Sequence, residues 1–340
     1  MLEQFPNIYE QQRRNRRKTV IIMALFVLFF AFLGYGFDLF YLDNDPIGVL
    51  GEARTAFPIA TAAALLLGGG MSLWGLQSGA KAVLSSAGAF PVPENDPQYR
   101  TLVNVVDEMV IASGEPRPRI YVIPDDDPNA FATGKDPAHS HIAVTRGLLK
   151  TLSREELQGV VAHEMSHVKN YDIRVMTVIA ALVGASLLLS DWARMGMRFG
   201  VMGSGGKKGR DSRGGVGGLI ALILLALWII AIILAPLLSQ ILAMAVSRQR
   251  EYLADASGAE LTRNPLALAK ALEKIEFADE PTQSVKKGSA HLCIVDPLGR
   301  KANLKEGAIA NLFATHPPIF KRITLLRAMA YQYQPAPMKD

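Results

Sequence analysis

Residues 160–172 read VVAHEMSHVKNYD, with two histidines four residues apart and a glutamate directly after the first. On a helix, residues i and i+4 share one face, so His163 and His167 can present imidazole nitrogens to one ion. Glu164 would lie toward the same cleft as a general base, the arrangement found in zinc-dependent peptidases. Two solvated histidines on a polar helix face are the alternative, and a third ligand would decide between them.

A capping box predicts where this helix begins. Ser153 is followed three residues later by Glu156, and the segment REELQGVVAHEMSHVKN continues without a proline. Two short β-branched runs, RIYVIP at 119–124 and HIAVT at 141–145, are bounded by Pro, Asp and Gly and are predicted strands. We therefore expect an α+β fold, mainly helical with a small β-sheet.

A catalytic zinc site needs three protein ligands and an open position. In the downstream stretch SRQREYLADASGAEL, Glu251 and Asp255 have helical i, i+4 spacing. We expect Glu251 to be the third ligand and Asp255 to accept the outer N–H of a metal-bound histidine. Glu260 is the reserve candidate. The alternative is an exposed carboxylate face paired with Arg248 and Arg250.

Four uncharged apolar stretches, at 19–37, 57–76, 175–190 and 214–247, indicate a multi-pass membrane protein. The 50% hydrophobic composition of the 340 residues supports this class. The first stretch is longer than the core of a cleaved signal peptide, and no small-residue cleavage site follows it. A transporter is disfavoured because none of the stretches holds a charged residue.

Loop charges predict the orientation in the membrane. Five basic residues precede the first stretch, whereas the loop after it is mainly acidic. The N-terminus and the polar segment from 77 to about 173 should therefore be cytosolic. The Gly-rich loop 192–216 holds six basic residues and one acid. If the stretches at 175–190 and 214–247 both crossed the membrane, this basic loop would lie outside and break the rule. The two stretches could therefore form a hairpin that does not fully cross, or the strong first anchor could override the local charge. The expected organisation is a basic cytosolic segment (1–18), two transmembrane helices (19–76), and a zinc peptidase domain (77–340) interrupted by an apolar hairpin (175–247).

The remaining composition restricts the possible partners. A net charge of +5, concentrated beside apolar runs, favours contact with the anionic surface of a lipid bilayer, and no nucleic-acid-binding motif is visible. Cys293, the single cysteine, is expected to be a buried packing thiol. At 1.5 Å per residue, a helix continuing from His167 to Val175 would hold the histidines about 12 Å from the apolar boundary. A metal there would lie at the membrane surface.

Two further stretches could take part in binding or catalysis. The stretch DPNAFATG, at 127–134, could form an exposed edge to which a peptide adds as a strand, through Asn129, Ala130, Phe131 and Ala132. An ordinary hairpin edge is the alternative. In ATHPPIFKRI, at 314–323, His316 could stabilise an oxyanion, or the stretch could be a helix start after a capping threonine. The other histidines, at 139, 141 and 291, are expected at the surface or in packing roles.

Together and in this order, HEMSH, SRQREYLAD, NAFATG and THPPIFKRI resemble the HtpX-type membrane zinc peptidases, relatives of the CAAX prenyl endopeptidases. The resemblance covers roughly residues 100–325. It implies a gluzincin-like fold, His163, His167 and Glu251 as zinc ligands, Glu164 as catalytic base and NAFATG as the substrate-binding edge strand. It also implies a cytosol-facing site in the cell (inner) membrane that degrades misfolded or damaged membrane proteins, a role in quality control and stress response.

The expected function is therefore endopeptidase activity with one Zn²⁺ per chain, His316 assisting. The alternatives are a non-catalytic membrane chaperone or scaffold with a structural metal, and a prenyl-protein peptidase. Glu164 disfavours a purely structural site, which has no use for a base and more often closes with four ligands. A prenyl-protein peptidase would be expected to show more membrane spans. The ligand set also accepts other divalent metals, and the oligomeric state is left open.

Overall fold

The protein is described by a computed structural model, which covers residues 8–42, 44–45, 47–49, 57–93, 95–184, 223, 225–226, 248–278, 284, 290–295 and 317–333. His316, the Gly-rich loop 192–216 and most of the apolar hairpin 175–247 lie outside these residues. The chain divides into two compact units. The first comprises Met1–Thr19, Leu76–Ala181 and Ala243–Asp340, and the second Val20–Gly75 and Leu182–Leu242.

Two long helices run through the described part of the second unit. They are α1 (Ile8–Tyr41) and α2 (Ile59–Ser86), each of which begins or ends in the first unit. Asp38 caps the start of α2, because its carboxylate accepts hydrogen bonds from the backbone N–H of Ala60 (3.0 Å) and of Thr61 (2.8 Å). Gly34 lets the helices approach closely, since a Cβ there would lie 2.7 Å from the Ala60 carbonyl oxygen. The pair is thus fixed by a cap and by a close backbone contact.

Both helices are long and apolar enough to cross a membrane. The candidate spans are Tyr9–Phe40 and Ile59–Ser86, so the first two apolar stretches form the predicted helices. The second helix continues beyond residue 76, where the sequence predicted the polar segment to begin. The basic residues before position 19 form the first turns of α1.

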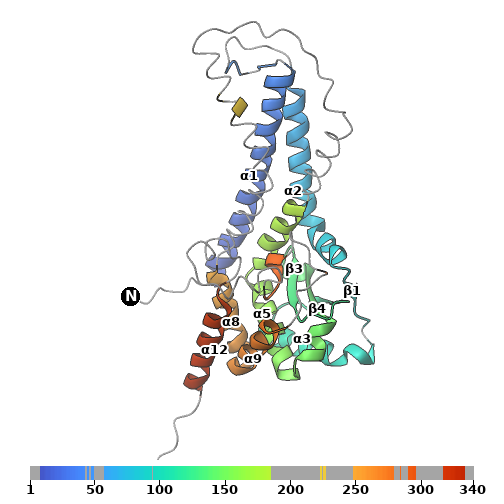
Figure 1. The fold of residues 1–340 in the computed structure, drawn as a ribbon, viewed down its shortest axis with the longest axis vertical. Coiled ribbons are helices and arrows are strands. Elements are labelled where there is room, and N and C mark those ends of the chain that lie inside the picture. The colour runs from blue at the N-terminus through green and yellow to red at the C-terminus, as the bar shows by residue number, and fades with distance from the viewer. Residues whose placement is uncertain are drawn as a thin grey trace, which may run out of the picture. The chain divides into compact units, whose positions relative to one another are not determined.

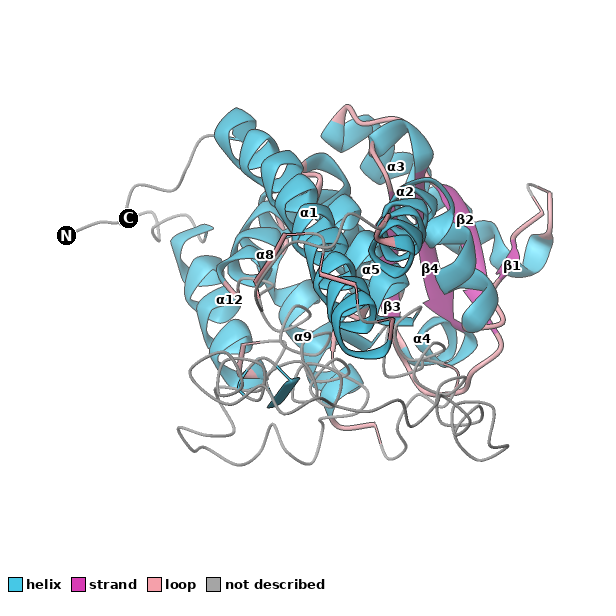
Figure 2. Cartoon of the chain, turned by 90° about the horizontal axis from the view of Figure 1, so that it is seen from above, coloured by secondary structure: helices cyan, strands magenta, loops and turns pink. Residues whose placement is uncertain are grey.

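The first unit contains a four-stranded sheet in the order β1-β2-β4-β3, drawn in magenta in Figure 2. Its strands are β1 (Phe90–Pro91), β2 (Arg119–Ile123), β3 (Ala130–Gly134) and β4 (Ser140–Thr145). β2 and β4 pair in parallel, and the other two pairs are antiparallel. The two predicted strands are confirmed as β2 and β4, and NAFATG contributes β3 at the edge of the sheet.

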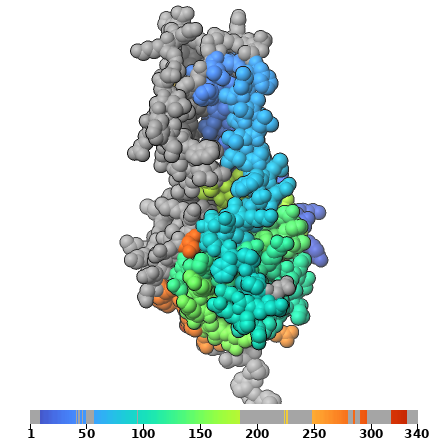
Figure 3. Space-filling model, turned by 90° about the vertical axis from the view of Figure 1, so that its right-hand side faces the viewer, coloured from blue at the N-terminus to red at the C-terminus, as the bar shows by residue number. Residues whose placement is uncertain are grey.

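Helices make up most of this unit (Figure 1). Helix α5 (Arg154–Lys169) packs against α3 (Arg100–Ser113), α8 (Gln249–Thr262) and α9 (Pro265–Glu276). The unit also contains α4 (Arg146–Thr151), α12 (Ile319–Tyr333), the 3-10 turns η1 (Pro97–Tyr99), η2 (Pro137–His139) and η3 (Ala290–Leu292), and residues 172–181 of a helix at 172–184. The segments from α3 to α5, drawn in teal to green in Figure 3, lie on one side of this unit. The mainly helical fold with a small mixed sheet confirms the predicted α+β class.

Helix α5 begins and ends at identifiable signals. The predicted capping box is present: Ser153 N–H donates to Glu156 Oε2 at 2.8 Å, and Ser153 Oγ accepts from Glu156 N–H at 3.3 Å. The helix does not continue into the apolar segment, as the 12 Å spacing assumed, because it stops at Lys169 and Tyr171 adopts a left-handed φ of 59°. The next helix begins at Asp172, so the break turns this side chain back toward α5.

Candidate metal centre

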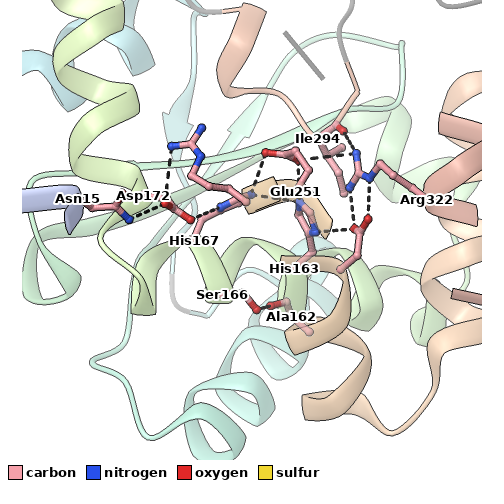
Figure 4. A network of polar contacts seen from close by, with 11 residues as sticks. Asn15, Ala162, His163, Ser166, His167, Asp172, Glu251, Ile294 and Arg322 are labelled. Atoms are coloured by element: carbon pink, nitrogen blue, oxygen red, sulfur yellow. Dashed lines mark hydrogen bonds and ion pairs between the residues drawn. The ribbon is translucent and has the colours of Figure 1, made fainter. Parts of the chain in front are cut away.

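Two imidazoles on α5 and one carboxylate on α8 meet in the interior of the first unit (Figure 4). The Nε2 atoms of His163 and His167 are 3.2 Å apart. Glu251 Oε2 lies 3.6 Å from His163 Nε2, and Glu251 Oε1 lies 3.7 Å from His167 Nε2. One ligand atom from each residue falls within 4.8 Å of the others, so the set could hold a metal ion. These are the three residues that the sequence singled out.

The donor chemistry fits a divalent cation. Each histidine has Nδ1 close to a carboxylate, so the proton is expected on Nδ1 and the lone pair on Nε2. Two lone pairs and a carboxylate directed at one point repel each other unless a positive charge lies between them. Burial disfavours a charged His163, but Asp255 and Glu251 outweigh that cost and raise its pKa to about 9. The surroundings therefore stabilise a positive charge, whether a proton or a metal.

Glu164 lies beside this set and is 1% exposed. Neither of its carboxylate oxygens has a hydrogen-bond partner among the described residues. Burial raises its pKa above the usual value, an effect that the neighbouring His163 and His167 oppose. A buried carboxylate without partners is costly. Glu164 therefore does not stabilise the fold, and its burial is better explained by a role in the reaction.

Asp255 contacts the outer nitrogen of the first histidine, as the sequence predicted. Its Oδ1 lies 3.0 Å from His163 Nδ1. The Arg322 guanidinium on α12 donates to both Asp255 oxygens at 2.7 Å and to the Ile294 carbonyl oxygen at 2.8 Å. Burial would raise the pKa of Asp255, but Arg322 outweighs it and holds the pKa below its usual value. Arg322 is thus a site residue to which sequence reasoning assigned no role.

A pattern in α12 could have revealed Arg322. The residue is 1% exposed and shares a helix face with Ile319 and Leu326, three residues before and four after it, which are also buried. A single charge on an otherwise apolar helix face requires a buried counter-charge.

Asp172 contacts the outer nitrogen of His167, as Asp255 does for His163. Sequence reasoning also assigned no role to Asp172. Its Oδ2 lies 3.1 Å from His167 Nδ1, while its Oδ1 accepts a hydrogen bond from Asn15 Nδ2 at 2.7 Å. Arg250 Nη1 is 3.6 Å from the same Oδ1. The sequence signal was weak, because the contact depends on the break at Tyr171, where no glycine or proline stands.

Close packing of α8 on α5 brings Glu251 to the histidines. A Cβ on Gly258 would lie 3.0 Å from the backbone nitrogen of His163, closer than side chains normally allow. Glu251 and Asp255 are each 3% exposed, which excludes an exposed carboxylate face for this pair. The reserve candidate, Glu260, is exposed and does not belong to the metal-binding group.

The predicted substrate segment lies at the sheet edge, but its residues are buried. Asn129 Nδ2 donates to the Val295 carbonyl oxygen at 3.1 Å, and the Ile294 backbone N–H donates to the Ala130 carbonyl oxygen at 2.9 Å. The side chains of Ala130, Phe131 and Ala132 are almost fully covered. Residues 294 and 295 therefore cover the first part of the edge, and Gly134 N–H at its other end donates to Thr177 Oγ1 at 3.0 Å. All five residues of β3 are buried, so the expected exposed edge is not found among the described residues.

The other histidines lie outside the metal-binding group. His139 is exposed and pairs with Asp136, His141 is half-buried, and His291 is buried with Nε2 3.2 Å from the Met176 carbonyl oxygen. Cys293 is a buried thiol. These positions confirm the surface and packing roles that the sequence predicted.

Comparison with known proteins places this geometry in a family. The sequence model of peptidase family M48 matches residues 97–330, a range that holds all the side chains of the candidate centre except Asn15. The chain belongs to peptidase family M48. It is therefore a metalloprotease, and the predicted resemblance to HtpX-type membrane zinc peptidases is confirmed.

Curated relatives of this M48 chain match almost its whole length. A "Protease HtpX homolog" from Caldanaerobacter subterraneus subsp. tengcongensis is 40% identical, over 95% of this chain and 98% of the relative. Another from Dictyoglomus turgidum is 38% identical, over 96% of both chains. The crystal structure of S. mikatae Ste24p aligns with 94% of this chain and 67% of its own, at 17% identity and a TM-score of 0.46.

Proposed function

We propose that this M48 protease is a multi-pass, zinc-dependent endopeptidase of the cell membrane that cleaves misfolded or damaged membrane proteins at a cytosol-facing site. One observation carries the proposal: His163, His167 and Glu251 converge beside a buried Glu164 whose carboxylate has no hydrogen-bond partner among the described residues. Three ligands with an adjacent base are what a catalytic site needs, whereas a structural zinc site usually closes with four.

His163, His167 and Glu251 would hold one zinc ion per chain. Zinc bound there would act as a Lewis acid and lower the pKa of a coordinated water toward about 7. Asp255 and Asp172 lie against the outer nitrogens of the two histidines and favour a proton there, which would leave both Nε2 lone pairs available to a metal. Other divalent metals fit the same donors, and zinc is proposed because the HtpX-type family uses it.

Glu164 is the proposed general base. Its carboxylate accepts a proton from the attacking water and returns that proton to the amine that leaves when the peptide bond breaks. Burial raises its pKa above the usual value, which makes the carboxylate a stronger base. His316 is retained as a candidate that stabilises the oxyanion, and Asn129 to Ala132 as the substrate strand.

The membrane setting supports the substrate class. The two apolar helices α1 and α2 can cross a bilayer, and the exposed arginines at 13, 14, 16 and 17 lie in the first turns of α1, before its apolar stretch at 19–37. By the positive-inside rule these charges favour a cytosolic N-terminus. Residues 1–19 and the metal-binding side chains belong to the same unit, so a cytosolic N-terminus implies a cytosolic site. Chains that leave the bilayer on that side are the substrates within reach.

The deciding experiment compares the wild type with Glu164→Gln, both purified in detergent and analysed for zinc. Each is incubated with an unfolded model protein, with and without chelator. We expect both to hold one zinc per chain, and only the wild type to cleave, in a manner lost with chelator and restored by zinc. Cleavage by zinc-loaded Glu164→Gln would refute the base assignment. Zinc without cleavage in both proteins would favour the membrane scaffold instead.

A further inference from the structure

The first turns of α1 carry a buried polar stripe. Within the α1 N-terminal segment (residues 8–19), Gln11, Asn15 and Thr19 recur every four residues and are 8%, 2% and 0% exposed. Arginines occupy the other faces and are exposed. A helix that precedes a membrane span needs no buried amide for anchoring, and burying one is costly unless it is hydrogen-bonded. The stripe therefore indicates a specific partner.

That partner is the short stretch at the end of α5, where the helix stops before the next one begins at residue 172. Asn15 Nδ2 donates to the Asn170 carbonyl oxygen at 2.9 Å, and Gln12 Nε2 donates to the Lys169 carbonyl oxygen at 2.8 Å. The Arg16 guanidinium lies 4.2 Å from the centroid of the Tyr171 ring. The α1 N-terminal segment thus holds the short stretch between His167 and the helix at 172–184.

Asn15 also reaches the side chain that orients His167. Asp172 Oδ1 accepts from Asn15 Nδ2 at 2.7 Å, which leaves Oδ2 for His167 Nδ1 at 3.1 Å (Figure 4). The amide holds the carboxylate in place, and Arg250 Nη1 forms a longer ion pair of 3.6 Å with the same Oδ1. Asn15 and Arg250 both contact Oδ1, so Oδ2 is left facing the His167 N–H, a contact that increases the basicity of Nε2.

We propose that Asn15 is a positioning residue of the metal centre, acting on His167 through Asp172. The proposal rests on the assignment of His167 as a metal ligand. It makes the start of the first candidate span a part of the active site. Docking of the α1 N-terminal segment should then increase the affinity for metal, and bound metal should stabilise the docked segment to the same degree.

The test measures zinc affinity of the detergent-purified full chain by competition with a chelating dye. Asn15→Asp keeps the side-chain size but directs a second carboxylate at Asp172, and Asn15→Leu removes the donor. We expect either change to weaken zinc binding by about 10-fold, at the lower end of the 10- to 100-fold effect of removing an outer-shell partner. Gln12→Leu is the matched control, because Gln12 contacts the same stretch but not Asp172.

A double-mutant cycle separates positioning from general loosening. In an Asp172→Asn background, Asn15→Asp should change the zinc Kd by less than about twofold, because the carboxylate through which Asn15 acts is gone. Equal losses in both backgrounds would overturn the proposal, as would an equal loss in Gln12→Leu. A second readout is amide hydrogen exchange in residues 8–19, which zinc should slow in the wild type but not in Asn15→Leu.

His167→Ala distinguishes failure of this inference from failure of the proposed function. If His167→Ala loses zinc while the Asn15 variants retain wild-type affinity, the ligand set stands and the positioning role is wrong. If His167→Ala binds zinc as the wild type does, the ligand set fails and the role of Asn15 fails with it.

Discussion

Arg322 donates two hydrogen bonds of 2.7 Å to Asp255, and this buried pair ties α12 to the helix that carries Glu251. Desolvation opposes a charged Arg322, but Asp255 outweighs it and raises the pKa of the guanidinium. Arg322 Nη1 is also 3.8 Å from Glu251 Oε2. The guanidinium is thus a fixed positive charge behind the candidate metal centre.

Removing Arg322 should therefore destabilise the fold. Arg322→Met leaves the buried Asp255 carboxylate without its guanidinium counter-charge, and removing one partner of a buried ion pair typically costs about 3–5 kcal/mol. Denaturant unfolding of the detergent-solubilised protein measures the loss. Arg327→Met is the matched control on the same helix, because Arg327 is exposed and pairs with Glu273 at the surface. The control should lose less than about 1 kcal/mol, and equal losses in the two variants would contradict the importance of the buried pair.

The two glutamates of α8 should differ in their effect on metal content. Glu251→Gln removes a charge from the candidate ligand set, so we expect loss of bound zinc and of proteolysis after dialysis. Glu260→Gln alters an exposed residue of the same helix and should keep one zinc per chain. Elemental analysis of both purified variants checks this. Zinc retained by Glu251→Gln and lost by Glu260→Gln would reverse the assignment.

A methyl group at Gly258 should separate α8 from α5. The added Cβ would lie 3.0 Å from the His163 backbone nitrogen, so one helix must shift. Overpacking of this kind costs about 1–3 kcal/mol. Because the shift moves Glu251 away from the histidines, Gly258→Ala should lower both the melting temperature and the zinc affinity. Ser257→Ala, a change at the neighbouring position, serves as control, and unchanged zinc affinity in Gly258→Ala would show that the helices can adjust.

His141 should make the fold sensitive to acid. Burial, followed by Arg119, His139 and Lys81, lowers its pKa from 6.5 to about 4. The folded protein thus favours the neutral ring, and the unfolded chain takes up a proton first as the pH falls. The contribution of His141 is complete above pH 6.5 and is lost as the pH falls toward 4.

Melting temperatures measured across that pH range, with chelator present so that metal release does not contribute, test this prediction. His141→Gln should show a smaller decrease on acidification than the wild type. An equal decrease in both proteins would assign the acid sensitivity to other groups.

Features that depend on residues close in the sequence could be predicted, whereas contacts between distant segments could not. The start of α5, strands β2 and β4, and the i, i+4 pair of histidines depend on neighbouring residues, and the sequence predicted them. Glu251 was reached because the required third ligand restricted the search to a few downstream carboxylates. Both Asp172 and Arg322 were assigned no role, because their partners are fixed only by the tertiary fold. The left-handed Tyr171 had no local signal, since a glycine or asparagine normally occupies such a position.

The place of Arg322 in the chain also sets an order of events during synthesis. A growing chain carries His163, His167 and Glu251 once α8 has been made, but Asp255 still lacks the guanidinium that stabilises its charge in the interior. The centre can therefore mature only after α12 is translated and docked. The charge balance of this buried cluster thus depends on the last described helix, and a chain that stops before α12 would hold Asp255 without its counter-charge.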